Sequence, residues 1–197
     1  MMEKKLFQTE RNTQTVSLPE RSEIEEKYKW DTAHIYSSED LWEKDFKWIE
    51  EQLPNYKNFY GKLNESAEIL EKCLKFDDEV GIKLERLYLY SMLSKDSDMR
   101  VTKYQAMNDR ITSLYANISS ASSFIRPEIL KIPADKLFKM IEENDGLKMY
   151  KHLIDNLIRA KTHTLSSDQE KILAMASELE LVSHNAFSMF TNSDLKF

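Results

Sequence analysis

The sequence Leu-Ile-Arg-Ala-Lys-Thr-His-Thr-Leu-Ser-Ser-Asp-Gln-Glu-Lys-Ile-Leu-Ala-Met-Ala occupies residues 157–176 and joins two predicted helices. Before and into this stretch, apolar residues recur at the spacing of one helix face, at Leu147, Tyr150, Leu153, Ile154, Leu157 and Ile158. Ser166 with Gln169, and Ser167 with Glu170, form two overlapping capping boxes. A second helix is therefore predicted to begin at one of these serines and to continue to about residue 190. The stretch predicts an architecture and contains no reaction centre.

The composition is typical of a helical protein that works in water. Of 197 residues, 41% are hydrophobic and 31% charged, while 3 Gly and 4 Pro leave few sites for tight turns. The net charge of -6 is spread without a long block of one sign, which predicts no nucleic-acid and no membrane partner. One cysteine, Cys73, suits a reducing cytosol, and no secretory leader or membrane-length apolar run is visible. These features predict a cytoplasmic protein with Cys73 in its core.

A long helical hairpin is the strongest single prediction. Val80, Leu84, Leu87 and Ser91 trace one face of its first arm, and residues 87–93 are apolar nearly all round, which predicts cover on several sides. The second arm repeats apolar residues at heptad spacing, at Tyr104, Met107, Ile111, Leu114, Ile118, Ala121 and Ile125. An arm over residues 101–125 would be ~38 Å long. The same seam could join two copies, but a polar corner at 95–100 favours an antiparallel hairpin.

Shorter helices are predicted on both sides of the hairpin. Residues 19–29 form one, and another carries Trp42, Phe46, Ile49 and Leu53 until Pro54 ends it. A short helix through Tyr56, Phe59 and Tyr60 stops at Gly61, Ser66 caps the next, and that helix breaks or restarts at Asp77 and Asp78. Pro127 discourages continuation of the hairpin arm, Pro133 opens a further helix, and Asn144, Asp145 and Gly146 stop it.

The predicted fold is all-α, with a helical hairpin of long antiparallel arms, a packed multi-helix bundle and a polar N-terminal arm. The expected domains are a flexible arm over 1–18, the N-terminal helices with the hairpin over 19–125, and a helical region over 126–197. The last two could equally form one continuous lobe.

Candidate chemistry is sparse. The four histidines, His34, His152, His163 and His184, include no His-Glu-x-x-His pattern, so the helical zinc motif is absent from the sequence. Asp96 and Asp98 resemble the start of a calcium loop, but Val101 stands where the loop needs glycine, and Met107 where it needs a bidentate acid. The tyrosines of the hairpin could line a peptide groove, although helical spacing favours packing; they are Tyr88, Tyr90, Tyr104 and Tyr115. We therefore predict no catalytic, cofactor-binding or metal-binding residue in this chain.

Several stretches resemble one family, and the most specific is Arg159-Ala160-Lys161-Thr162-His163-Thr164-Leu165-Ser166, followed by Glu170. The others, in chain order, are Tyr28-Lys29-Trp30-Asp31 with Ile35-Tyr36, Leu87-Tyr88-Leu89-Tyr90 through Asp96 and Asp98, Ser123-Phe124-Ile125-Arg126-Pro127-Glu128-Ile129-Leu130, and residues 192–197. Together they resemble the N-terminal region of oligoendopeptidase F, a family of thimet-oligopeptidase-like zinc metallopeptidases. The resemblance runs from about Arg21 to Phe197.

The resemblance implies a helical substrate-channel lobe from a cytoplasmic hydrolase that cleaves short peptides. The family's zinc ligands lie beyond the position matching Phe197, so zinc is expected only in an intact family member and no metal or catalytic residue carries over. On this first reading the partners are an oligopeptide substrate and the catalytic lobe. The second reading is a stand-alone scaffold or peptide-binding module, with a homodimer through exposed apolar surface as a further possibility. An open frame after Phe197 reaching His-Glu-x-x-His would favour the first reading, and a natural stop the second.

Overall fold

The computed structural model describes residues 21–97 and 101–161, together with the single positions 183, 187 and 190. Every regular element in the described ranges is helical, which confirms the all-α class. In chain order these elements are η1 (Arg21–Glu23), η2 (Glu26–Tyr28), η3 (Thr32–His34), α1 (Glu39–Gln52), η4 (Leu53–Asn58), α2 (Ala67–Ser97), α3 (Thr102–Ser122), α4 (Ile125–Lys131), α5 (Ala134–Glu143), α6 (Asp145–Lys148) and α7 (Lys151–Ala160), where η denotes a 3₁₀ helix.

The described residues form two compact units. The first comprises residues 21–55 with 77–97 and 101–121, and the second comprises 56–76 with 122–161. Helix α2 is 31 residues long and contributes its first part to the second unit and its remainder to the first. The domains expected over 19–125 and 126–197 stay a prediction.

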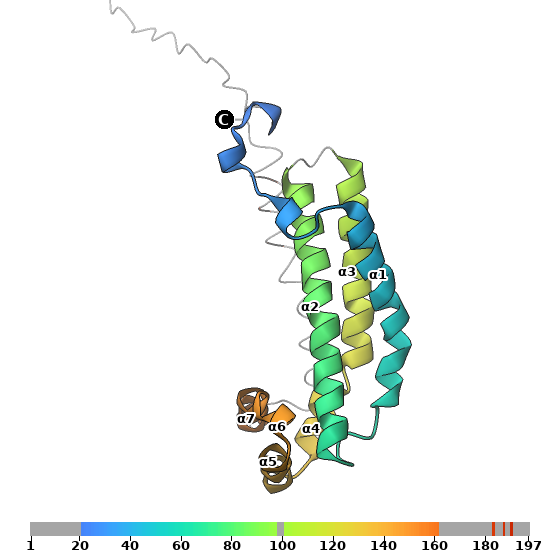
Figure 1. Ribbon diagram of the computed structural model, residues 1–197, viewed down its shortest axis with the longest axis vertical. Helices are drawn as coiled ribbons and strands as arrows, with labels where there is room; N and C mark the ends of the chain where they lie inside the picture. Colours follow the sequence, from blue (N-terminus) through green and yellow to red (C-terminus); the bar gives the residue numbers. More distant parts are fainter. Residues whose placement is uncertain (1–20, 98–100, 162–182, 184–186, 188–189, 191–197) are drawn as a thin grey trace, which may run out of the picture. The chain divides into compact units, whose positions relative to one another are not determined.

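In the first unit, α1, α3 and the longer part of α2 lie side by side (Figure 1). Their directions follow from four contacts: Trp42 with Leu87, Asp45 with Lys83, Glu39 with Lys103, and Glu43 with Arg110. In the contacts between α1 and α2, the residue numbers of α2 fall as those of α1 rise, so these two helices are antiparallel. In the contacts between α1 and α3, the residue numbers of both helices rise together, so these two are parallel. Helices α2 and α3 are therefore antiparallel, as the sequence predicts for the hairpin.

Most positions of the apolar periods predicted for these helices are buried, while Leu53, Tyr104 and Ala121 are partly exposed. Ten of these core side chains are Trp42, Phe46, Ile49, Val80, Leu84, Leu87, Met107, Ile111, Leu114 and Ile118. The prediction that residues 87–93 are covered on several sides is wrong, because Tyr88 and Leu89 expose 36% and 41% of their surface. Helix α2 buries the face that meets α1 and α3 and leaves its other face to solvent.

One backbone carbonyl links α1 to α2 at the centre of this core. The buried indole of Trp42 donates from Nε1 to the Leu87 oxygen at 3.0 Å. The Ser91 hydroxyl, also buried, lies 3.0 Å from the same oxygen and 3.0 Å from the Tyr88 oxygen, and its one proton is shared between these two carbonyls. Both polar groups are satisfied without solvent, which removes the free-energy cost of burying them.

The second unit is built from short helices, with α5 against α6 and α4 against α7. Its buried side chains include Tyr56, Leu63, Leu70, Cys73, Leu74, Ile125, Ile129, Leu137, Met140, Ile141, Leu147, Ile154 and Leu157. Cys73 is fully buried, which confirms its predicted place in the core. Gly61 has φ of 76°, a value that favours glycine, but the 3₁₀ helix η4 ends at Asn58, so the predicted helix through Tyr60 with its stop at Gly61 is wrong.

Asn144 organises the joint between α5 and α6. Its Oδ1 accepts hydrogen bonds from the backbone N–H groups of Gly146 at 2.8 Å and Leu147 at 3.2 Å. Its Nδ2 donates to the Glu71 carboxylate at 2.8 Å. A Cβ on Gly146 would lie 1.9 Å from Glu71 Oε1, so a larger residue there would displace the carboxylate that holds Asn144. The predicted stop at Asn144 is confirmed, and the same residue also caps α6.

Several predicted boundaries differ from the structure. In place of a helix over 19–29, the described part of that range has the two 3₁₀ turns η1 and η2. Helix α2 continues through Asp77 and Asp78 without a break, and α3 ends at Ser122 rather than at residue 125. Pro127 is the third residue of α4, in the first turn, where a backbone N–H has no intrahelical partner to lose.

The remaining predictions fall mostly outside the described residues. These include the polar arm over 1–18, the capping boxes at 166–170 and most of the helix expected to follow them. Phe187 and Phe190 are described singly and expose 66% and 55% of their surface. In the ranges that the structure describes, no helix is long and apolar enough to cross a bilayer.

Candidate functional site

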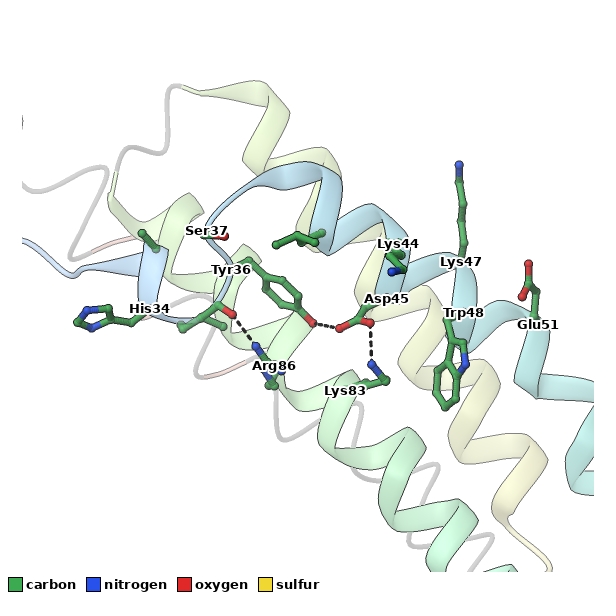
Figure 2. A pocket seen from close by; sticks show the side chains of 13 residues that line it. His34, Tyr36, Ser37, Lys44, Asp45, Lys47, Trp48, Glu51, Lys83 and Arg86 are labelled. Atoms are coloured by element: carbon green, nitrogen blue, oxygen red, sulfur yellow. Dashed lines mark hydrogen bonds and ion pairs between the residues drawn. The ribbon is translucent and has the colours of Figure 1, made fainter.

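A pocket of about 800 Å³ lies in the first unit. Figure 2 shows its lining side chains, which come from the segment around η3, from α1 and from α2. Helix α1 places Lys44, Asp45 and Trp48 on one wall because residues three and four positions apart share a helix face. Helix α2 supplies Lys83 and Arg86 in the same way.

Asp45 lies at the centre of the pocket. Its Oδ1 accepts a hydrogen bond from Lys83 Nζ at 2.7 Å, and its Oδ2 accepts one from the Tyr36 hydroxyl at 2.9 Å (Figure 2). Burial raises the pKa of Asp45, but the hydrogen bonds from Lys83 and Tyr36 and the charges of Lys83 and Arg86 outweigh it. The pKa of Asp45 therefore lies below its usual value, and the carboxylate is charged at neutral pH.

Tyr36 forms the floor beside Asp45 and is itself buried. Its burial, followed by its hydrogen bond to Asp45 and the charge of Asp45, raises the pKa of the hydroxyl, while Arg86 opposes the rise. The Arg86 guanidinium lies over the ring at 5.0 Å and donates from one amino group to the Ile35 carbonyl at 2.8 Å. Tyr36 stays protonated at neutral pH and acts as a hydrogen-bond donor.

The apolar wall of the pocket is made by Trp48 and Leu41. The Trp48 indole is half-buried, and Lys83 Nζ lies 5.1 Å from its ring centre. Leu41 exposes 45% of its surface. An aromatic ring and an exposed leucine beside ammonium and guanidinium groups suit a ligand with an apolar part and a negative charge.

The pocket is positively charged although the whole chain carries a net charge of -6. Its lining has four cationic side chains, Lys44, Lys47, Lys83 and Arg86, against two carboxylates, Asp45 and Glu51. In Figure 2, Lys47 and Glu51 extend away from Asp45 and mark the rim. Asp45 is already tied to Lys83 and Tyr36, so the arrangement suits binding more than proton transfer.

The sequence did not predict this pocket, because its cations are spaced far apart in the chain and look like ordinary surface charge. One of the four histidines lines it: His34, whose Nε2 lies 3.3 Å from Asp31 Oδ2. His152 lies 2.9 Å from Asn156 on an exposed face of α7, while His163 and His184 fall outside the described residues. Within the described ranges, no three His, Cys, Asp or Glu residues gather as a metal site would require.

The hairpin tyrosines do pack, yet they also border a smaller surface pocket. Tyr88 on α2 and Tyr115 on α3 meet edge to face, with ring centres 6.4 Å apart. The Tyr115 hydroxyl donates to Glu85 at 3.3 Å, and all three residues line a pocket of about 540 Å³. Of the other two tyrosines, Tyr90 packs edge to face on Tyr36 and Tyr104 lies under Lys103.

Asp96, from the calcium-like pair, lies 3.7 Å from Lys95, and Asp98 is outside the described residues.

Comparison with known proteins gives this helical chain a family context. The family model described as Oligopeptidase F matches residues 128–197. Oligopeptidase PepF of Bacillus subtilis is 38% identical over 180 residues, which cover 91% of this chain and 27% of that protein. The chain is homologous to the oligoendopeptidase F proteins. The plasmid-encoded oligoendopeptidase F of Lactococcus lactis is a second such relative, 35% identical over 181 residues, with 89% of this chain and 30% of that protein covered.

A solved structure extends the homology to three dimensions. The crystal structure of oligoendopeptidase-F from Enterococcus faecium aligns with a TM-score of 0.67 and 30% identity, covering 80% of this chain and 31% of that one. The resemblance found in the sequence is thus confirmed. The chain spans less than a third of the length of these oligoendopeptidase F relatives.

Proposed function

We propose that this chain is the helical, peptide-contacting lobe of a zinc-dependent oligoendopeptidase that cleaves short peptides, and that it has no hydrolytic activity alone. The observation that carries the proposal is the 38% identity to an oligopeptidase across 91% of the chain. The relatives are named as oligopeptidases and oligoendopeptidases, which supports a peptide as the substrate class. The catalytic lobe is the partner that this proposal requires.

The proposed division of labour follows from the chemistry of catalytic zinc. Such zinc takes three protein ligands and keeps one open position. The sequence has no His-Glu-x-x-His, and the described residues gather no set of three ligands, so these residues do not fit a zinc site. What this chain would contribute is binding surface, above all the basic, aromatic pocket around Asp45. The single, buried Cys73 supports a cytoplasmic location for the activity.

A chimera tests the proposal. This chain would replace the matching region of the Bacillus subtilis relative, and hydrolysis of a quenched oligopeptide would be measured at equal zinc content. We expect cleavage within about tenfold of the parent enzyme's kcat/KM, because homologous lobes should present the peptide in the same way. The matched control lacks the region altogether and should be inactive. A folded, zinc-loaded chimera that does not cleave would contradict the proposal.

The isolated chain gives the complementary test. Purified alone, it should show no peptide cleavage that a chelator abolishes and zinc restores. Reproducible zinc-dependent cleavage, with contaminants excluded, would show that the chain holds its own catalytic centre.

The second candidate function is a stand-alone peptide-binding scaffold, which the pocket around Asp45 favours. A homodimer through exposed apolar side chains such as Phe187 would accompany either function, and sedimentation equilibrium of the full chain tests it. A strictly monomeric sample would rule the dimer out.

A further inference from the structure

We propose that the pocket formed by the segment around η3, α1 and α2 binds the C-terminal carboxylate of a peptide, with the last side chain of that peptide against Trp48. The inference rests on the proposed function only in taking the ligand to be a peptide. It goes further by naming the end of the peptide that is recognised and the residues that recognise it.

The charges of the pocket favour a single carboxylate. Both Asp45 oxygens already accept hydrogen bonds, one of them from Lys83, so these two charges largely compensate each other. Arg86 donates to the neutral carbonyl of Ile35 and, within the described residues, has no carboxylate within 4.0 Å. Lys44 likewise lines the pocket, and among those residues it forms no ion pair. Two cations therefore face the pocket with charge to spare.

The geometry of these cations suits a carboxylate. A guanidinium presents a planar fork of N–H donors that matches the two oxygens of a carboxylate. One amino group of Arg86 donates to the Ile35 carbonyl, and the guanidinium lies over the Tyr36 ring. The guanidinium is therefore oriented before a ligand arrives. Preorganised donors lose less conformational entropy on binding than free side chains do.

The apolar wall favours a peptide end over an inorganic anion. Trp48 is half-buried and Leu41 is exposed, and both border the same space as Arg86 and Lys83. Figure 2 shows the Trp48 indole on the side of Lys83 that is away from Tyr36. A free phosphate would meet the cations but would leave this wall in contact with water. A volume of about 800 Å³ accommodates a terminal residue and its neighbours.

A matched pair of small probes tests the recognition directly. N-acetyl-L-phenylalanine has a free carboxylate, and N-acetyl-L-phenylalaninamide has the same shape without the charge. Each would be titrated into the full chain while the indole N–H signal of Trp48 is followed by NMR, with the signal assigned from Trp48→Phe. We expect saturable shifts with the acid and binding at least about tenfold weaker with the amide, because a charge-assisted hydrogen bond is lost. Equal affinity for the two probes, or no shift with the acid, would overturn the proposal.

Two pocket variants and one control locate the charge that matters. Arg86→Gln should weaken binding of the acid about tenfold while leaving the amide unchanged, and Lys44→Gln gives a second measurement should Arg86→Gln fold poorly. Lys72→Gln removes the same charge from an exposed position of α2 outside the pocket and should change affinity less than about twofold. An equal loss of affinity for the acid in Lys72→Gln would mean that binding responds only to the net charge of the chain, and would overturn the proposed site.

Longer peptides separate this inference from the proposed function. An oligopeptide with a free C-terminus should bind the full chain more tightly than its amidated form. If both forms bind equally well, the chain is a peptide-binding lobe and the carboxylate site is wrong. If the small acid binds as expected but neither peptide does, the carboxylate site stands and the peptide-binding function fails.

Discussion

The polar contacts inside the first unit differ in kind from those inside the second. In the first unit, ion pairs join separate long helices: Lys83 with Asp45, Lys103 with Glu39, and Arg110 with Glu43. In the second, the ion pairs formed by described residues stay within one helix, and side chains reach across to backbone groups instead. These cross-contacts are Glu128 with the Gly61 N–H, Lys136 with the Asn64 carbonyl, and Lys161 with the Leu130 carbonyl.

Helix length explains the difference. Helices α1, α2 and α3 have 14, 31 and 21 residues, whereas α4 to α7 have 7, 10, 4 and 10. Helices shorter than about 12 residues are marginal by themselves, so their ends and loops must be fixed by neighbours. Long helices instead meet along continuous apolar faces. The first unit should therefore be most sensitive in its core, and the second at its caps.

The largest effect is expected from Leu114→Asp in the core of the first unit. Leu114 is buried on α3, and a carboxylate there would be unpaired in an apolar environment. We expect a loss of about 3–5 kcal/mol in the free energy of unfolding, measured by urea denaturation. Asn117→Asp adds the same charge at an exposed position of α3 and should change little. A free energy of unfolding in urea equal to that of the parent would show that Leu114 does not lie in the core.

A smaller and more local effect is expected from Asn144→Ala in the second unit. The variant loses two acceptor contacts at the start of α6 and the donor contact to Glu71, which should cost about 1–2 kcal/mol. Amide hydrogen exchange should speed up in α5 and α6 and stay unchanged in α3. Asn117→Ala, at an exposed site in α3, is the control. An equal increase in amide exchange rates across both units would contradict the expectation that the effect of Asn144→Ala stays within the second unit.

The ion pair of Arg110 with Glu43 should contribute less than its geometry suggests. Arg110 and Glu43 side chains expose 42% and 37% of their surface, so solvent screens their attraction. A double-mutant cycle with Arg110→Met and Glu43→Gln should give a coupling of about 0.5 kcal/mol that shrinks in high salt. Arg110 also lies 4.3 Å from the Phe46 ring centre, so Arg110→Ala should cost more than this coupling. A coupling above about 2 kcal/mol would show that the pair is effectively buried.

The smallest effect is a pH dependence that belongs to the first unit. The folded-state pKa of Asp45 is depressed below its unfolded value. Its contribution to stability is therefore present above about pH 4 and is lost as pH falls through the folded pKa. The hydrogen bond from Arg110 lowers the pKa of Glu43 in the same direction. Thermal melts of Asp45→Asn should fall less steeply below pH 4 than melts of the parent, and parallel curves would refute the assignment.

The two units also differ in how well the sequence predicts them. The heptad residues from Met107 to Ile118 and the stripe from Val80 to Ser91 are buried as expected, because a long helix with one apolar face has few other ways to pack. The break expected at Asp77 was wrong because tertiary packing overrides a local helix-breaking signal, whereas the hairpin arm does end before Pro127, at Ser122. The pocket around Asp45 could not be predicted, since its residues come together only when α2 returns past α1.

The Leu87 carbonyl, which accepts from the Trp42 indole and shares the Ser91 hydroxyl proton with the Tyr88 carbonyl, has a consequence for vibrational spectroscopy. Each donor draws electron density from the C=O bond and weakens it, and neighbouring hydrogen bonds polarise one another. Its stretching band should therefore lie below that of helical carbonyls with the usual single donor. An isotope-edited infrared band from a carbonyl label at Leu87 would move upward when α1 separates from α2, and so would report the docking of those two helices through a single bond.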